Sequence, residues 1–530
     1  MNQFRLRFRL LIEFMQERKL ELSKIFCLGL LSNMLSIIIP VSVGKYYDLE
    51  FGHASQRSNI LNFLPEYFTA DTKGFLTFFI MIITFRFAFF IWYNYKLKSQ
   101  GELFIKTVKD SLFEHQLNMD YEVYYKHGIS KYLLRYSGDI TSLKNLFTSG
   151  TISIIIDIWI AVMAFAWLIY LDTVGGFIVL TTTILLYFLL FLINKKIEFY
   201  AIEKRDTTSG QLGFVNRTFN AIISVIGFNK ENTELEKFKK RTGKVYEHAL
   251  KLNYWDSINK GLITFMQFGV LVIVFLVFHL TKSLQKTPGE LISFILLYIT
   301  VLPVLSRLYR IETIYRMGLI SLSKINYIFS LPNSKSHEGR KLTAEDFNVE
   351  IINIRINKSA KLSIKTEEKF TYVTLPDNLK SFDLIKVLLC ISKEYKGKIL
   401  INERNIREYS PKSIRKSLVV ISTQLPLIGN TVFEAISYSR SEEAKTNSIE
   451  ILSEIQTKYG LSNHLTINFN IGENGKNLSP LELEILIVAR ALLTKKRIVI
   501  IDQLPYLNKI NENVLIELLS GFECKCIYLS

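Results

Sequence analysis

The sequence predicts an α-helical membrane domain of six transmembrane helices, followed by an α/β domain with a largely parallel sheet. The chain has 530 residues, of which 49% are hydrophobic and 21% charged, and its mean hydropathy is +0.21. Apolar and charged residues must therefore be segregated along the chain, as in a protein with membrane spans and polar parts. Six long apolar stretches and a final third of alternating β-rich and helical runs complete this prediction.

The six apolar stretches have the length of membrane helices. They are residues 25–43, 75–92, 152–171, 175–193, 262–280 and 291–308. Lys and Arg are frequent before the first stretch and in residues 96–144 and 195–260, but few near Arg57, Asp172 and Lys282. Because Lys and Arg accumulate in cytoplasmic loops, we expect a multi-pass protein with both termini in the cytoplasm, in the inner membrane if the source is bacterial.

The formal charge of +17 follows from the same bias, so we expect a lipid bilayer and no nucleic acid as partner. The four cysteines are scattered except for one C-x-C pair, and no His or Cys stands at metal spacing. Neither a disulfide framework nor a metal site is therefore expected.

Two charged residues, Arg86 and Asp157, fall inside apolar stretches. An unpaired charge at the bilayer centre costs at least about 2.5 kcal/mol, so each needs a reason to be there. One interpretation is that the two side chains pair between neighbouring helices. The other is that they line a substrate cavity.

The soluble part is expected over residues 345–530, after a membrane domain of residues 1–332 and a linker of residues 333–344. Short β-rich runs at 370–374, 418–422, 497–502 and 526–529 alternate with helical stretches. Such alternation is typical of an α/β domain, and four-residue apolar strands are typical of buried parallel strands.

A phosphate-binding loop should lie between the first of these strands and the next helix, where it needs glycines, a Lys and a hydroxyl. Lys380 and Ser381 stand at the Lys and hydroxyl positions of a Walker A motif. Thr374 and Leu379 fill the two Gly positions, and Pro376 lacks an N–H. We therefore expect a broken phosphate cradle.

The layout of the membrane half resembles that of ABC exporters, in which two long intracellular helical arms follow the second and fourth spans. Residues 127–139, with a Gly before two Leu, an Arg and an Asp, resemble the first-arm segment of this family. Residues 219–228 resemble the second-arm segment, and residues 321–332 resemble the exit from the sixth helix.

The soluble half resembles the nucleotide-binding domain of the same family. Gln424 stands at the Q-loop position, and residues 478–482 read Leu-Ser-Pro-Leu-Glu where the family signature is Leu-Ser-Gly-Gly-Gln. The Walker B segment ends in Asp502, with Gln503 in place of the Glu that polarises water. The chain ends at Ser530, just after the strand that the switch His would follow.

The resemblance implies ATP and Mg²⁺ as cofactors and Lys380, Ser381, Gln424, Ser479 and Asp502 as nucleotide-binding positions. It implies no intact catalytic base, since an amide such as Gln503 is a poor general base. It also implies a homo- or heterodimer with another ABC half-transporter, and a heterodimer with a competent partner is favoured because both kinds of motif are damaged here.

Three functions remain to be compared. The first is the catalytically impaired half of an export system, whose substrate the sequence leaves open among peptides, proteins, lipids and drugs. The second is a membrane scaffold or regulator that keeps the exporter fold without transport. The third, an independently active ATPase, is opposed by Gln503 and by the lost glycines.

Overall fold

The protein is described from a computed structural model. It describes residues 8–52, 72–123, 132, 134–136, 138–280, 287–332, 339–342, 347–356, 359–366, 368–437, 441–461, 465–472 and 475–529. The first-arm segment around residues 127–131 thus lies outside the described residues. Two compact units are formed, one of Met1–Leu117 and His127–Leu331, the other of Asn118–Lys126 and Pro332–Ser530.

The first unit is helical throughout its described residues. Its helices are α2 (Arg9–Glu17), α3 (Lys19–Glu50), α4 (Thr72–Leu117), α7 (Gly138–Phe147), α8 (Ile154–Leu171), α9 (Thr173–Asn220), α10 (Ile222–Gly227), α11 (Glu231–Leu280), α12 (Pro288–Tyr309) and α13 (Ile311–Phe329), with the short turns η3 (Leu134–Tyr136) and η4 (Thr148–Ser153). Within the described part of the chain, six helical segments are long and apolar enough to cross a membrane. Each contains one of the six predicted stretches, so the predicted membrane helices are confirmed.

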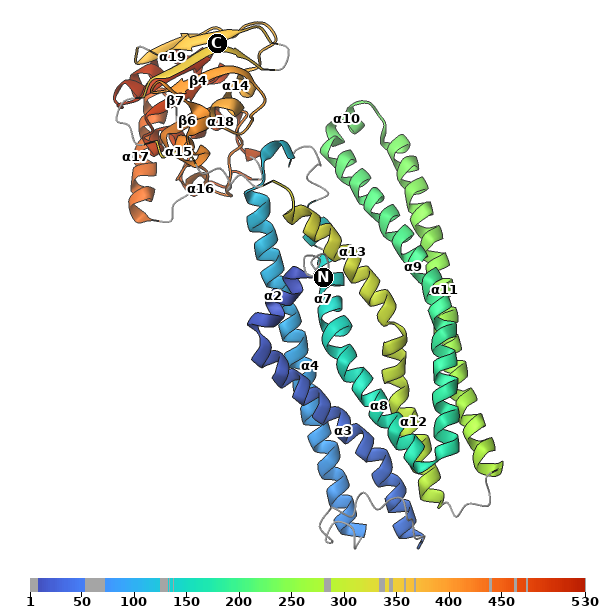
Figure 1. Cartoon of the computed structure of the whole chain (residues 1–530). Coiled ribbons are helices and arrows are strands. Elements are labelled where there is room, and N and C mark those ends of the chain that lie inside the picture. The colour runs from blue at the N-terminus through green and yellow to red at the C-terminus, as the bar shows by residue number, and fades with distance from the viewer. Residues whose placement is uncertain are drawn as a thin grey trace. The chain divides into compact units, whose positions relative to one another are not determined.

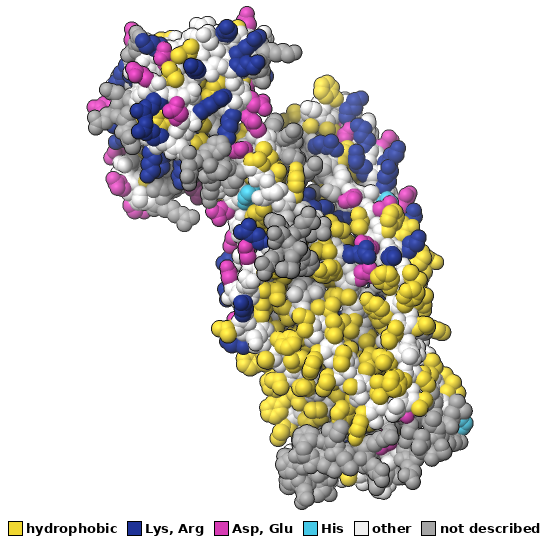
Figure 2. Space-filling model, in the orientation of Figure 1, with side chains coloured by type: hydrophobic (Ala, Val, Ile, Leu, Met, Phe, Trp, Pro, Cys, Tyr) yellow, Lys and Arg dark blue, Asp and Glu magenta, His cyan; other side chains and the backbone are white. Residues whose placement is uncertain are grey.

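Three of these helices continue far beyond their apolar stretches. α4 has 46 residues, α9 has 48 and α11 has 50. At 1.5 Å per residue α9 is about 70 Å long, more than twice the ~30 Å of a bilayer core. α9 and α11 run side by side and are joined by α10 at one end (Figure 1). Figure 2 shows the consequence, with apolar side chains in a band over the spans and charged ones beyond it.

At the opposite end of the spans, α3 and α12 approach closely. A Cβ on Gly289 would collide with the backbone of Gly44, so both positions require glycine. The carboxylate of Asp48 accepts hydrogen bonds from the Gly289 N–H at 2.9 Å and the Thr287 hydroxyl at 2.7 Å. This buried Asp48 thereby caps the N-terminus of α12.

The second unit contains two sheets. An antiparallel sheet has the order β2-β1-β4-β5, formed by β1 (Val349–Arg355), β2 (Leu362–Lys365), β4 (Lys396–Ile401) and β5 (Arg404–Asn405). A parallel sheet has the order β3-β8-β7-β6, formed by β3 (Phe370–Val373), β6 (Leu418–Ile421), β7 (Ile498–Ile501) and β8 (Lys525–Leu529). The parallel sheet uses the four predicted strands, whereas the antiparallel one was not anticipated.

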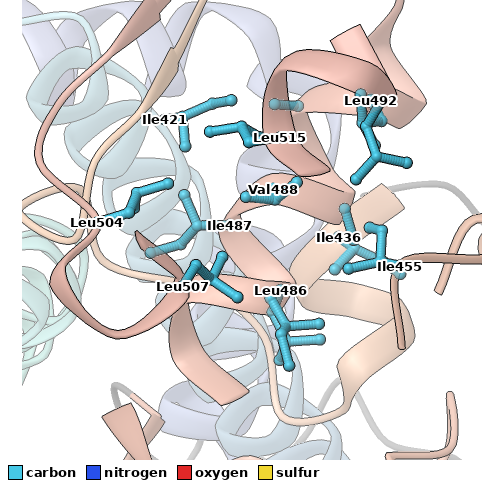
Figure 3. Close-up of a cluster of buried hydrophobic side chains, with 14 of the residues drawn as sticks. Ile421, Ile436, Ile455, Leu486, Ile487, Val488, Leu492, Leu504, Leu507 and Leu515 are labelled. Carbon is cyan, nitrogen blue, oxygen red and sulfur yellow. The ribbon is translucent and has the colours of Figure 1, made fainter. Parts of the chain in front are cut away.

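Six helices accompany the sheets. They are α14 (Ser381–Leu388), α15 (Pro411–Ser417), α16 (Val432–Ser437), α17 (Glu442–Lys458), α18 (Pro480–Thr494) and α19 (Pro505–Ser520). α18 lies within the larger core cluster, and its Leu486, Ile487 and Val488 point in different directions into apolar neighbours (Figure 3). The sequence of α18 is apolar nearly all round because the helix is buried nearly all round.

Candidate functional site

The parallel sheet brings the predicted nucleotide motifs to one edge. The loop after β3 leads to Lys380, Asp502 follows β7, and the turn after β6 holds Gln424. Because all four strands run in the same direction, their carboxyl ends meet at this edge, where α/β proteins bind ligands. β8 lies between β3 and β7, which separates those two strands by about 10 Å.

The loop between β3 and α14 is a short turn that is anchored to the domain core by one apolar side chain, that of Leu379. The Leu379 N–H donates to the Pro376 carbonyl at 3.1 Å, and the Leu379 side chain is buried in the domain core. Asn378 adopts a φ of 67°, the left-handed conformation that favours glycine. Lys380 is exposed at the N-cap of α14, with Ser381 as the first helical residue. One backbone N–H of this loop, that of Leu379, is thus already bonded within the loop, and Pro376 supplies none.

Asp502 is buried and its carboxylate is already hydrogen-bonded. It accepts from the Ser422 hydroxyl at 2.8 Å and from the Gln503 N–H at 2.9 Å. The Gln503 side chain itself is exposed. Asp502 is therefore positioned by the ends of β6 and β7.

Ser422 connects this carboxylate to the Q-loop position. Its hydroxyl donates to Asp502 and accepts from the Gln424 N–H at 3.2 Å. Ser422 is fully buried, whereas the Gln424 side chain is exposed. Sequence reasoning did not single out Ser422, although its place directly after a buried strand was the available signal.

The signature-like segment, residues 478–482, caps the N-terminus of α18 with its own side chains. The Ser479 hydroxyl accepts from the Glu482 N–H at 3.3 Å, and the Glu482 carboxylate accepts from the Ser479 N–H at 2.6 Å, which makes a capping box. Pro480 at the first helical position has no N–H. The positive end of α18 is therefore neutralised by the carboxylate of its own Glu482.

Glu484, two residues further along α18, is a second residue that the sequence did not reveal. Its carboxylate is buried and accepts from the N–H groups of Tyr506, at 3.1 Å, and Leu507, at 2.8 Å. It thereby caps the start of α19. Burial raises the pKa of Glu484, and the two backbone hydrogen bonds act in the opposite direction.

The two membrane charges are not brought together, so their predicted pairing is wrong. Asp157 in α8 instead forms a bidentate ion pair with Arg307 in α12, at 2.6 and 2.9 Å. Packing between α8 and α12 decides this choice. Arg86 in α4 forms no hydrogen bond or ion pair with the described residues, and its side chain is partly exposed.

The residues at the sheet edge fit ATP and Mg²⁺ poorly. Lys380, Ser381 and Asp502 supply a cation, a hydroxyl and a carboxylate at the same edge. The loop before α14 lacks an N–H at Pro376 and uses the N–H of Leu379 within the loop, so it offers fewer backbone donors than a phosphate cradle needs.

Comparison with known families agrees with both halves of the chain. The family model "ABC transporter transmembrane region" matches residues 22–303, and the model "ABC transporter" matches residues 380–504. The fold is that of an exporter-type half-transporter with a fused nucleotide-binding domain, and the chain belongs to the ABC transporter family.

The particular relatives are distant. An ATP-dependent lipid A-core flippase from Francisella novicida is 20% identical over 435 residues, which cover 77% of this chain and 72% of the relative. The flippase from Nitrosococcus oceani is 21% identical over 422 residues, with coverages of 77% and 70%. A bacterial Atm1-family ABC exporter with ATP bound has the same fold, with a TM-score of 0.78, 14% identity and coverages of 97% and 92%.

Proposed function

We propose that this chain is the catalytically impaired half of an ABC export system, which pairs with a competent half-transporter to form one translocation path. The observation that carries the proposal is the self-capped α18, where Glu482 and Pro480 remove the anion-binding capacity of the signature segment. The loop before Lys380, which lacks an N–H at Pro376 and uses that of Leu379 internally, weakens the other half of a composite site in the same chain. A homodimer would then combine two weakened halves, so a heterodimer is favoured.

The surface of α10 supports a partner chain. Two of its apolar side chains and two that flank it are more than half exposed, and no described residue of α10 is buried. The two in α10 are Ile223 and Ile226, and the flanking ones are Phe219 and Phe228. They lie where α10 joins the far ends of α9 and α11 (Figure 1), and Figure 2 shows charged side chains gathered at this end of the unit. Exposed apolar clusters in polar surroundings mark interaction surfaces, so we assign this one to the second subunit.

Arg86 is proposed to face the translocation path. It makes no hydrogen bond or ion pair with the described residues, and Asp157, the other charge within an apolar stretch, is paired with Arg307. A cation within a membrane span that lacks a partner in its own chain is a candidate for contact with substrate. The names of the relatives make a lipid the first substrate to test. Both termini and the long arms are proposed to lie in the cytoplasm.

The test is movement of a fluorescent lipid across proteoliposomes that contain this chain and a candidate partner. An impaired transporter half predicts that movement stops when the catalytic Glu of the partner is replaced by Gln. Movement that persists after this replacement, or that is unchanged when this chain is omitted, would contradict the proposal.

The second candidate is a scaffold that retains the exporter fold without transport. The capping box of α18 also favours a scaffold, because a helix end whose N–H groups are bonded within the chain has little capacity left to bind nucleotide. A scaffold predicts that the two chains associate but that no combination of them moves lipid or hydrolyses ATP.

A further inference from the structure

A cavity of about 500 Å³ lies among the helical arms of the first unit, outside its apolar spans. It forms where α7 and α13, which pack together, meet α9 and α11, which also pack together. It is lined by residues of these four helices and by Arg135 of η3. The cavity lies entirely within the first unit.

The charged lining is predominantly positive. Arg135, Lys204, Arg205 and Lys324 line the cavity against only two carboxylates, Asp139 and Asp206. Asp139 is buried and is already shared by Arg135 and Arg205, and it also accepts from the Ser321 hydroxyl at 3.1 Å. The carboxylates present therefore leave an excess of positive charge at this place.

Three of these cations have hydrogen-bond donors that no acceptor among the described residues uses. One guanidinium nitrogen of Arg205, Nη1, is buried without any hydrogen-bond partner. Neither Lys204 nor Lys324 forms an ion pair among the residues that the structure describes. A buried donor such as Arg205 Nη1 is costly unless an acceptor occupies the cavity, and the two half-buried lysines add further donors there.

We propose that this cavity binds the phosphate group of a water-soluble ligand. Its cationic donors come from three different elements and are joined by the hydroxyls of Ser142, Thr208 and Ser209, which also line it. Donors that converge from several directions suit the non-planar oxygens of a phosphate, whereas a planar carboxylate is best held by one guanidinium fork.

The position of the cavity along α9 indicates a soluble source for the phosphate. Arg205 lies twelve residues beyond the apolar stretch that ends at Ile193. At 1.5 Å per residue it is about 18 Å outside the bilayer core, beyond the ~5–8 Å of the headgroup layer. A phospholipid headgroup in the bilayer would not reach it.

The experiment is calorimetric titration of the full chain in detergent with inorganic phosphate. The cavity variant is Lys204→Gln with Lys324→Gln, whose side chains form no ion pair with the described residues. The matched control is Lys239→Gln with Lys240→Gln, two exposed lysines of α11 outside the cavity. Each cavity lysine contributes a charge-assisted hydrogen bond, so each removal should weaken phosphate binding about tenfold. The control pair should bind as the wild type does.

Two further measurements test where phosphate binds and whether a lipid headgroup can supply it. Lys380→Ala should leave phosphate binding unchanged, and vesicles of phosphatidylglycerol should not compete with inorganic phosphate more than vesicles of phosphatidylcholine do. The proposal is overturned if no saturable binding is seen, if Lys380→Ala abolishes it, if the cavity and control variants behave alike, or if only the anionic vesicles bind. None of these outcomes depends on a partner chain or on ATP hydrolysis, so they are independent of the proposed export function.

Discussion

At the scale of single residues, buried carboxylates hold neighbouring helices of this protein in place. Asp157 binds Arg307 between α8 and α12, and Asp48 caps α12 from α3. Each carboxylate has lost its water and depends on the donors of another helix. Removal of one partner should therefore affect stability more than removal of an isolated charge.

Arg307→Ala should destabilise the membrane unit, because it leaves the Asp157 carboxylate buried without its cation. Arg307 is 52% exposed, so we expect about 2 kcal/mol, less than the ~3–5 kcal/mol of a fully buried pair. Thermal unfolding in detergent measures this change. The control Arg86→Ala removes a charge without an ion pair and should unfold like the wild type while it lowers lipid movement. Equal unfolding temperatures for Arg307→Ala and the wild type would contradict the role of the pair.

Glu484 predicts a pH dependence of stability. Burial raises its pKa above the value of 4.5 in the unfolded chain. The folded state therefore binds the proton more tightly, so the contribution of this group is complete below pH 4.5 and is lost as the pH rises through the folded pKa. Glu484→Gln cannot ionise and keeps one acceptor oxygen for α19.

The difference in unfolding temperature between Glu484→Gln and the wild type should therefore become more positive as the pH rises above about 4.5 and through the folded pKa. Other titrating groups are common to both proteins and cancel in this difference. Thermal unfolding of the full chain across this range provides the data. A difference that stays constant with pH would show that Glu484 does not titrate differently in the folded state.

At the scale of elements, the N-terminus of α18 is capped by its own side chains, Ser479 and Glu482. Pro480→Gly combined with Glu482→Gln restores one N–H and removes the carboxylate from the helix end, while Gln at the third position still supports the cap. In a complex with a competent partner, ATP hydrolysis should rise by about tenfold, since one more donor faces the developing charge. Addition of Ser479→Ala to this variant should reverse the gain. No change in rate would mean that the cap does not limit activity.

The second element is α10, whose apolar side chains contact none of the described core. Ile223→Ser with Phe228→Ser should leave the unfolding temperature unchanged, because these side chains are 84% and 74% exposed. Copurification of the partner should fall by at least about tenfold, as for a cluster of interface anchors. The exposed pair Lys239→Ser and Lys240→Ser serves as control. Retention of the partner by the α10 variant would contradict the proposed interface.

At the scale of the whole molecule, the sequence predicted those parts that depend on local pattern. Apolar length identified all six spans, and apolar runs identified β3, β6, β7 and β8. In the structure the parallel strands end at one edge, so Lys380, Gln424 and Asp502, which follow β3, β6 and β7, lie at the same edge of the sheet.

The missing parts depend on tertiary packing. Several cations compete for a buried carboxylate such as Asp157, and only the packing of α8 on α12 selects Arg307. Ser422 and Glu484 bind groups that lie 80 and 23 residues away in the chain. The antiparallel sheet pairs β1 with β4, which local alternation cannot specify.

ATP hydrolysis by the purified chain, alone and in complex with a partner, tests the central claim most directly. We predict that the chain alone hydrolyses no ATP, that the complex does, that replacement of the catalytic Glu of the partner abolishes this activity, and that Lys380→Ala in this chain leaves it nearly unchanged. Hydrolysis by the chain alone that Lys380→Ala abolishes would contradict the account, because the loop before α14 would then be a working phosphate site.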